Sequence, residues 1–146
     1  IVTQEQILEE QQKEKEFVPE EIKGKRILVA EDNELNAEIT LTVLKEKGLL
    51  VERAANGKEC VEMLKEKPAD YYDMILMDIQ MPEMDGYQAT EMIRNLGDSR
   101  AAVPIVAMTA NAFEEDRQKT LDAGMNAHVS KPVDMNVLFR VMAKFI

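Results

Sequence analysis

The feature that most constrains the fold is a regular alternation, from Lys25 onwards, of short apolar runs with segments of helical periodicity. Short apolar runs rich in β-branched residues are typical of buried parallel strands. Strands that alternate with helices imply right-handed crossovers, with helices on both faces of the sheet. The sequence therefore predicts an α/β fold with a doubly wound, five-stranded parallel sheet. The predicted strands are Arg26–Ala30, Leu49–Ala54, Met74–Met77, Pro104–Thr109 and Ala127–Ser130.

The predicted helices carry apolar residues at helical spacing. Asn33 is a suitable N-cap for the first, in which Leu35, Ile39, Thr42 or Val43, and Leu44 recur up to Gly48 as a stripe expected to face the core. Comparable stripes predict three further helices, marked by Val61, Met63 and Leu64, by Ala89, Met92, Ile93 and Leu96, and by Val137, Leu138, Val141 and Met142. The segment Leu121–Gly124 is expected to close one more helix, the fourth in chain order.

The N-terminal segment differs from the rest of the chain. Residues 1–23 are rich in Glu and Gln, contain few bulky apolar residues and include a breaking Pro19. We interpret them as an acidic linker or the tail of an upstream helix, and residues 24–146 as the folded domain. The first residue is Ile1, so we expect a fragment of a longer protein.

Charge and apolar content restrict the partners. The net charge of −10 disfavours direct binding of nucleic acid, whose phosphates an acidic surface repels. No apolar run reaches the length of a membrane span, so we expect no membrane contact by this segment. The single Cys60 excludes an internal disulfide and is expected to be buried. We expect a cytoplasmic location, whether or not the parent protein is anchored in a membrane.

Polar residues follow the predicted strands where each one ends. Glu31 and Asp32 follow the first strand, Asp78 the third and Lys131 the fifth, while Thr109 ends the fourth. Ligands of such sheets bind beyond the carboxyl ends of the strands, where the strand order reverses. We therefore expect these side chains to converge.

Three converging carboxylates repel one another unless a cation joins them, and Mg²⁺ favours carboxylate and phosphate oxygens. Lys131 adds a fixed positive charge and Thr109 a hydroxyl donor. These groups suit phosphoryl transfer, in which a carboxylate can be the nucleophile. Simpler interpretations exist for each residue alone: Glu31 and Asp32 could favour a helix N-terminus, and Asp78 could cap a loop.

Four segments carry a family resemblance: Ile27–Asn33, Met77–Gly86, Pro104–Ala110 and Ser130–Pro132. In this order they resemble the signature segments of response-regulator receiver domains of two-component signalling. The resemblance spans roughly residues 25–146 and implies a flavodoxin-like sheet of strand order 2-1-3-4-5. The amino-acid sequence of these segments, together with the acidic linker before them, is similar to that of the C-terminal receivers of hybrid sensor histidine kinases.

The resemblance implies a role for each site residue. Asp78 would be the phosphoacceptor, and Thr109 and Lys131 would contact the phosphoryl oxygens. Mg²⁺ would be held by Asp78 and Asp32 directly, by Glu31 through water and by the backbone carbonyl of Gln80. The peptide bond between Lys131 and Pro132 would be cis.

The resemblance also implies partners and output. A histidine kinase or a histidine phosphotransfer domain would supply the phosphoryl group, and hydrolysis of the aspartyl phosphate would reset the domain. Phosphorylation would switch the surface near the fourth helix, fifth strand and fifth helix. The parent protein would be a histidine kinase, whereas the domain itself is a phosphoacceptor.

His128 departs from the family pattern, which often has Tyr or Phe three residues before the lysine. A titrating switch at His128 is one hypothesis, and a histidine simply accommodated in a strand is the other. Gln80 and Asn111 occupy positions that tune phosphoryl lifetime in the family.

Three alternatives stay open. A haloacid-dehalogenase-like phosphatase needs a second Asp two residues after its nucleophile, where this chain has Gln80. A flavodoxin-like cofactor binder needs a phosphate-cradling loop after its first strand, where this chain has Glu31 and Asp32. A degenerate receiver that acts only as a binding module is the third.

Overall fold

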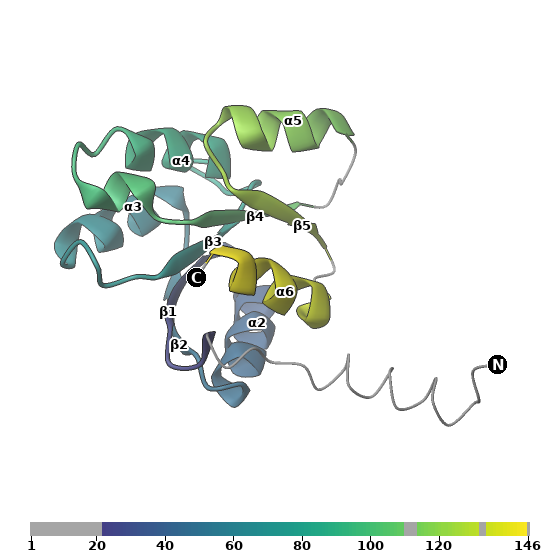
Figure 1. Ribbon diagram of the computed structural model, residues 1–146. Coiled ribbons are helices and arrows are strands. Elements are labelled where there is room, and N and C mark those ends of the chain that lie inside the picture. Colours follow the sequence, from purple (N-terminus) through teal and green to yellow (C-terminus); the bar gives the residue numbers. More distant parts are fainter. Residues whose placement is uncertain (1–21, 110–113, 132–133, 146) are drawn as a thin grey trace, which may run out of the picture.

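A five-stranded parallel sheet forms the centre of the molecule in the computed structural model, which describes residues 22–109, 114–131 and 134–145 (Figure 1). The strand order is β2-β1-β3-β4-β5, and every neighbouring pair is parallel. The predicted fold class and strand order are therefore confirmed. The predicted linker, residues 1–23, falls largely outside the described residues.

Strands and helices alternate along the chain as the sequence predicts. The strands are β1 (Arg26–Ala30), β2 (Leu50–Ala54), β3 (Met74–Asp78), β4 (Ile105–Thr109) and β5 (Ala127–Ser130). The helices are α2 (Glu34–Glu46), α3 (Gly57–Glu66), α4 (Gly86–Arg94), α5 (Glu114–Asp122) and α6 (Met135–Phe145), with a short 3-10 helix, η2 (Ser99–Ala102).

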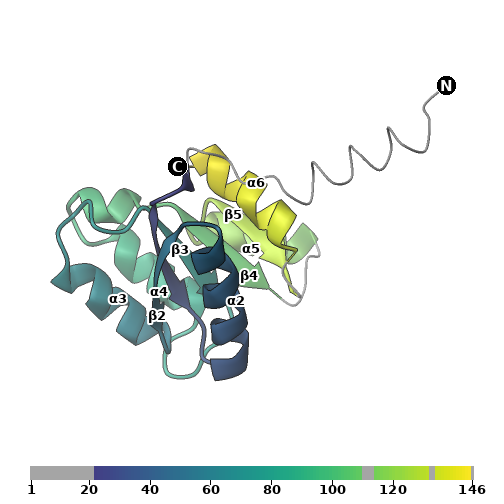
Figure 2. The ribbon, with the colours of Figure 1, turned by 90° about the horizontal axis from the view of Figure 1, so that it is seen from below.

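Helices cover both faces of the sheet (Figures 1 and 2). Side chains of α3 and α4 pack on one face, against alternate residues of β1, β3 and β4. Leu44 of α2 and three residues of α6 (Leu138, Phe139 and Met142) pack on the other face. Burial of apolar area on both faces is the main contribution to the stability of the fold. Strands that are covered on both faces need apolar side chains on both, and the central strands are almost entirely apolar.

The two central strands β3 and β4 are buried along their whole length. The predicted fourth strand included Pro104, but the ladder begins at Ile105 because proline has no N–H to donate. Pro104 still contributes its carbonyl, which accepts a hydrogen bond of 2.9 Å from the Ile75 N–H. Cys60 of α3 is fully buried, as predicted.

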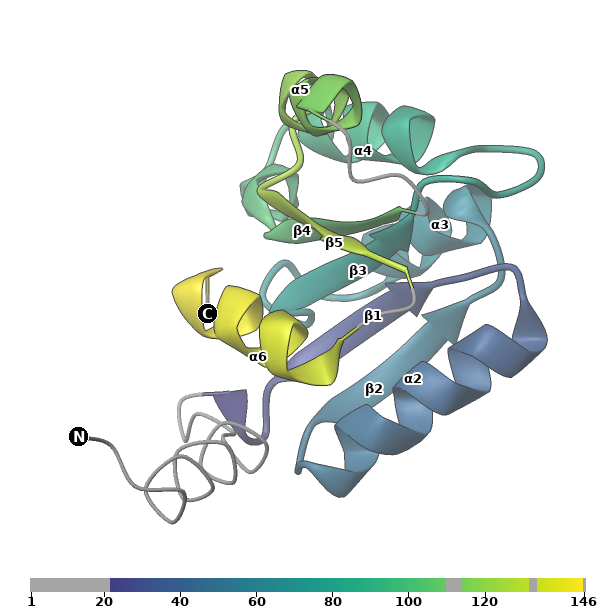
Figure 3. The same cartoon turned by 90° about the vertical axis from the view of Figure 1, so that its right-hand side faces the viewer.

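One part of the predicted core is wrong. Leu35 and Ile39 are 65% and 57% exposed, whereas Ala37 and Leu44 of the same helix are buried. The helix lies beside β1 and β2 at one margin of the sheet (Figure 3), so only one side of it meets the core. Helical spacing alone does not show which apolar residues an element at the margin will bury.

Among the residues that the structure describes, no helix has both the length and the apolar character needed to cross a membrane.

Candidate functional site

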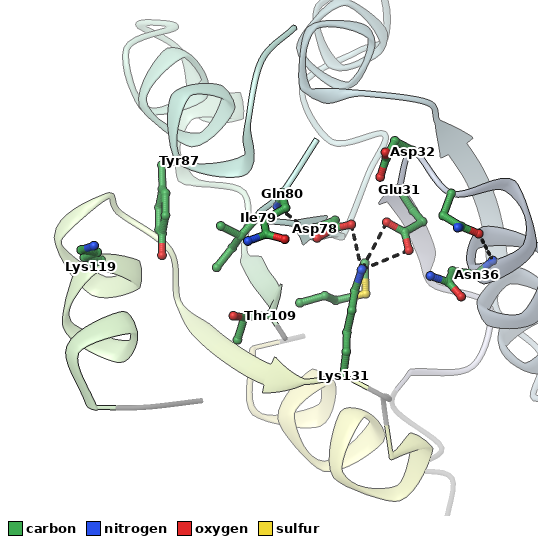
Figure 4. A pocket seen from close by; sticks show the side chains of 12 residues that line it. Glu31, Asp32, Asn36, Asp78, Ile79, Gln80, Tyr87, Thr109, Lys119 and Lys131 are labelled. Carbon is green, nitrogen blue, oxygen red and sulfur yellow. Dashed lines mark hydrogen bonds and ion pairs between the residues drawn. The ribbon is translucent and has the colours of Figure 1, made fainter. Parts of the chain in front are cut away.

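A polar pocket lies at the carboxyl ends of the central strands (Figure 4). The switch point of the strand order falls there, because β1 is followed by α2 on one face and β3 by α4 on the other. Glu31 and Asp32 enter the pocket from the end of β1, Asp78 from β3, Thr109 from β4 and Lys131 from the end of β5. The structure thus brings together the side chains that the strand ends predicted.

Lys131 joins two of the three acidic side chains. Its Nζ lies 2.8 Å from Oδ2 of Asp78 and 3.1 Å from Oε1 of Glu31. Both carboxylates are almost fully buried, with Glu31 2% and Asp78 5% exposed. The ammonium of Lys131 therefore offsets part of the cost of burying the carboxylates of Asp78 and Glu31 away from water.

The backbone after β3 holds Asp78 in place. The Gln80 N–H donates to Oδ1 of Asp78 at 3.2 Å, and the Gly86 N–H donates to the Ile79 carbonyl at 2.9 Å. A Cβ at position 86 would stand 2.5 Å from the backbone oxygen of Asp78, too close for any side chain. Glycine at this position lets the first turn of α4 pack directly behind the candidate phosphoacceptor.

Burial and charge shift the protonation of this cluster. Burial first and the neighbouring Asp78 second raise the pKa of Glu31 from 4.5 to about 7, against a smaller lowering effect of Lys131. Burial alone would lower the pKa of the Lys131 ammonium, but its contacts with Asp78 and then Glu31 outweigh burial and raise that pKa. The site therefore holds more negative charge than Lys131 neutralises, and it attracts a proton or another cation.

The donor set fits a hard divalent ion. Glu31, Asp32 and Asp78 each offer a carboxylate oxygen, and these oxygens all lie within 4.8 Å of one another. Mg²⁺ prefers carboxylate oxygens and keeps several waters, for which the open side at the exposed Asp32 leaves room. Burial and the nearby Asp78, which raise the pKa of Glu31, also favour a cation here, because a bound cation would stabilise the charged form of that carboxylate.

Among the described residues, six others line the pocket and were not predicted as site residues, and three of these belong to helices: Asn36, Tyr87 and Lys119. In Figure 4, Tyr87 and Lys119 lie on the opposite side of Asp78 from Glu31 and Asp32. Asn36, Tyr87 and Lys119 belong to helices that follow the strands. The search for polar residues at strand ends could therefore not find them. For Tyr87, the two-residue distance from the N-cap Asp85 places it in the first turn of α4, near the strand ends.

The other predicted features have different outcomes. Gln80 lines the pocket, and the proposed metal-binding role of its carbonyl stays a prediction. His128 is half-buried in β5, paired in register with Ala107 of β4, and its switch role stays a prediction. Asn111 and the cis bond at Pro132 lie outside the described residues.

The profile of the response regulator receiver domain matches residues 27–143. With the order of the sheet and the acidic pocket at its switch point, this match shows that the chain belongs to the response regulator receiver domain family. The family assignment disfavours two of the alternatives, the haloacid-dehalogenase-like phosphatase and the flavodoxin-like cofactor binder.

The chain spans less than a fifth of the length of two curated relatives that it matches. The chain is 42% identical over 132 residues to hybrid signal transduction histidine kinase B of Dictyostelium discoideum, covering 84% of this chain and 7% of that protein. It is 40% identical over 122 residues to two-component system protein A of Emericella nidulans, covering 83% of this chain and 17% of that protein. The resemblance to receivers of hybrid histidine kinases is thereby confirmed.

Solved structures of receiver domains share the fold of this chain. The receiver domain of a sensor histidine kinase from Pseudomonas aeruginosa, with magnesium coordinated in its cleft, is 38% identical, with a TM-score of 0.74 over 84% of this chain and 97% of that one. A co-crystal of the Saccharomyces cerevisiae histidine phosphotransfer protein Ypd1 and the receiver domain of Ssk1 contains a chain 30% identical to this one. That chain matches with a TM-score of 0.77 over 85% of this chain and 90% of its own length.

Proposed function

We propose that this receiver domain accepts a phosphoryl group from a phosphohistidine on Asp78, within a hybrid sensor histidine kinase. The observation that carries the proposal is the position of Asp78. Its carboxylate is buried at the carboxyl end of β3, in contact with the ammonium of Lys131 and within 4.8 Å of carboxylate oxygens of Glu31 and Asp32. A buried carboxylate that contacts a lysine ammonium and faces an open polar pocket is suited to act as a nucleophile.

The transfer exchanges one bond for another. A carboxylate oxygen of Asp78 attacks the phosphorus atom, the bond between phosphorus and the donor imidazole nitrogen breaks, and an acyl phosphate forms. Because phosphoryl transfer depends mainly on positioning and on neutralising the equatorial oxygens, Lys131 and Thr109 are well placed to assist. Hydrolysis of the acyl phosphate returns Asp78 to its free form.

Asp78 and Asp32 are the proposed direct ligands of Mg²⁺, with Glu31 acting through water and Gln80 through its backbone carbonyl. The bound ion supplies positive charge that the incoming phosphoryl group requires. The Pseudomonas receiver with magnesium in its cleft supports this assignment.

The proposed donor is the phosphohistidine of a histidine phosphotransfer domain or of a kinase. A donor histidine can reach Asp78 only if its domain covers the mouth of the pocket. Leu35 and Ile39 of α2 expose apolar surface beside that mouth, where Asn36 lines the pocket. Exposed apolar residues next to a polar site favour protein association, and the Ypd1–Ssk1 complex offers a precedent.

The proposed output is a change in the face formed by α5, β5 and α6. Lys131 directly follows β5, and its N–H donates to the Thr109 carbonyl at 2.7 Å, so the two residues are linked through the backbone as well as through the pocket. A phosphoryl group at Asp78 adds charge that both residues can contact, which biases the segments that carry them.

Transfer from a radiolabelled phosphohistidine phosphotransfer domain tests the proposal. We expect label to move to the wild type in Mg²⁺ and to be released as inorganic phosphate by mild base, the lability that marks an acyl phosphate. Asp78→Asn should accept none while keeping the thermal stability of a folded domain, and Asp85→Asn, at the cap of α4, should accept normally. Wild-type protein that accepts no label from any donor would favour a degenerate receiver that only binds.

A further inference from the structure

Arg53 of the edge strand β2 reaches the backbone that follows β1. Its Nε donates to the carbonyl of Glu31 at 3.2 Å, and its Nη2 donates to the carbonyls of Glu31 and Asp32 at 3.1 and 3.2 Å. The residue lines no part of the polar pocket, yet it binds the main chain of two residues whose carboxylates do.

Other contacts fix the same short segment at its two ends. The Glu31 N–H donates to the Ala54 carbonyl at 3.1 Å, which extends the ladder between β1 and β2. Asn33 then caps α2, since its side chain accepts from the Asn36 N–H at 3.0 Å. Between these two anchors the chain turns away from the sheet, and the carbonyls that Arg53 binds belong to this turn.

We propose that Arg53 is a positioning residue for the metal site, an inference that rests on the proposed function. By holding both carbonyls, it fixes the direction in which the Glu31 and Asp32 carboxylates leave the backbone. The planar guanidinium suits this task because its donors are set at fixed angles, whereas a lysine ammonium is a single rotating point of charge. Outer groups that orient metal ligands contribute strongly to affinity.

The charge of Arg53 acts in the opposite direction. A fixed positive charge near the pocket repels Mg²⁺, so its removal would by itself tighten binding. The guanidinium points at carbonyls rather than at the carboxylates and is partly exposed to solvent, which screens that repulsion. Orientation therefore outweighs repulsion, and substitution should weaken binding.

Two variants separate orientation from charge. Arg53→Met keeps the apolar stem but removes the charge and every donor, and we expect its dissociation constant for Mg²⁺, measured by calorimetric titration, to rise roughly tenfold. Arg53→Lys keeps the charge but loses the planar set of guanidinium donors, so its dissociation constant for Mg²⁺ should also rise above that of the wild type. Amide exchange at residues 31–33 in metal-free protein should be faster in both variants.

Arg100 provides a matched control. Its Nε donates to the carbonyls of Leu64 and Lys67 at 3.1 Å, near the end of α3, so it too binds the backbone with its guanidinium, but away from the pocket. Arg100→Met should lower thermal stability and leave the Mg²⁺ affinity of the wild type unchanged.

The outcomes distinguish this inference from the function on which it rests. Wild-type protein that binds no Mg²⁺ would overturn the metal assignment, and this inference with it. Wild-type binding with equal or tighter binding by Arg53→Met would overturn the positioning role alone. The positioning role would also be overturned if Arg53→Lys bound Mg²⁺ as tightly as the wild type. The same holds if Arg100→Met lost as much affinity for Mg²⁺ as Arg53→Met.

Discussion

At the scale of single residues, the site is defined by an imbalance of charge. Lys131 contacts both Asp78 and Glu31, while Asp32 adds a third carboxylate at the exposed rim. One ammonium cannot neutralise three carboxylates, and the pKa of Glu31 is raised by burial first and by the neighbouring Asp78 second. If a metal ion supplies the missing positive charge, binding of a phosphoryl group at Asp78 should depend on that ion.

The stability of metal-free protein should depend on Glu31 between pH 4.5 and about 7. The folded chain binds the Glu31 proton more tightly than the unfolded chain, because burial and then Asp78 raise the pKa of Glu31 to about 7. The stability linked to that proton is complete below pH 4.5 and is lost as pH rises through about 7. Thermal melting without Mg²⁺ should show this loss in the wild type and a flatter profile in Glu31→Gln; identical profiles would contradict it.

Removing Lys131 should cost more stability at high pH than at low pH. Lys131→Met leaves two buried carboxylates facing each other without their cation, and we expect a loss of about 2 kcal/mol in metal-free protein at pH 8. Lys119→Met removes a cation that lines the same pocket but is exposed on α5, and it should change stability little. Equal urea unfolding curves for the two variants would show that the contacts of Lys131 do not stabilise the fold.

At the scale of elements, the close packing between β3 and α4 places Asp78. Gly86→Ala inserts a methyl group against the backbone oxygen of Asp78, and we expect a loss of about 1–3 kcal/mol together with slower phosphorylation. Gly97→Ala is the comparison, because no atom lies within 4 Å of its added Cβ and only its positive φ of 81° is strained. Chemical denaturation and acetyl phosphate labelling measure the two effects. Normal labelling of Gly86→Ala would show that this packing does not position Asp78.

The elements could be predicted where burial is complete and less well at the margins. Met74–Met77 is apolar throughout because β3 is covered on both faces, so its identity as a strand was clear. The exposure of Leu35 and Ile39 was not predictable, since it depends on what packs against α2. The strand-end residues of the site were predictable for a topological reason, because parallel strands bring their carboxyl ends together. Arg53 was not, because its contacts are made between the side chain of one strand and the backbone after another.

At the scale of the whole molecule, the acidic pocket and the exposed apolar residues of α2 form one approach for a partner. Leu35→Gln and Ile39→Gln should slow phosphotransfer from a protein donor, because the donor domain loses apolar contact, and should leave labelling by acetyl phosphate unchanged. Leu50→Gln is the matched control, since Leu50 is 50% exposed but lies at the start of β2, at the opposite end of the sheet. Stopped-flow or quenched transfer rates measure the effect, and equal rates for all three variants would place the donor elsewhere.

The central claim is that Asp78 accepts the phosphoryl group, and intact mass after incubation with acetyl phosphate tests it most directly. The wild type should gain the mass of one phosphoryl group with Mg²⁺ present and none when the ion is chelated, and Asp78→Asn should gain none in either condition. A gain that persists in Asp78→Asn would contradict the account, because it would place the phosphoryl group on another residue.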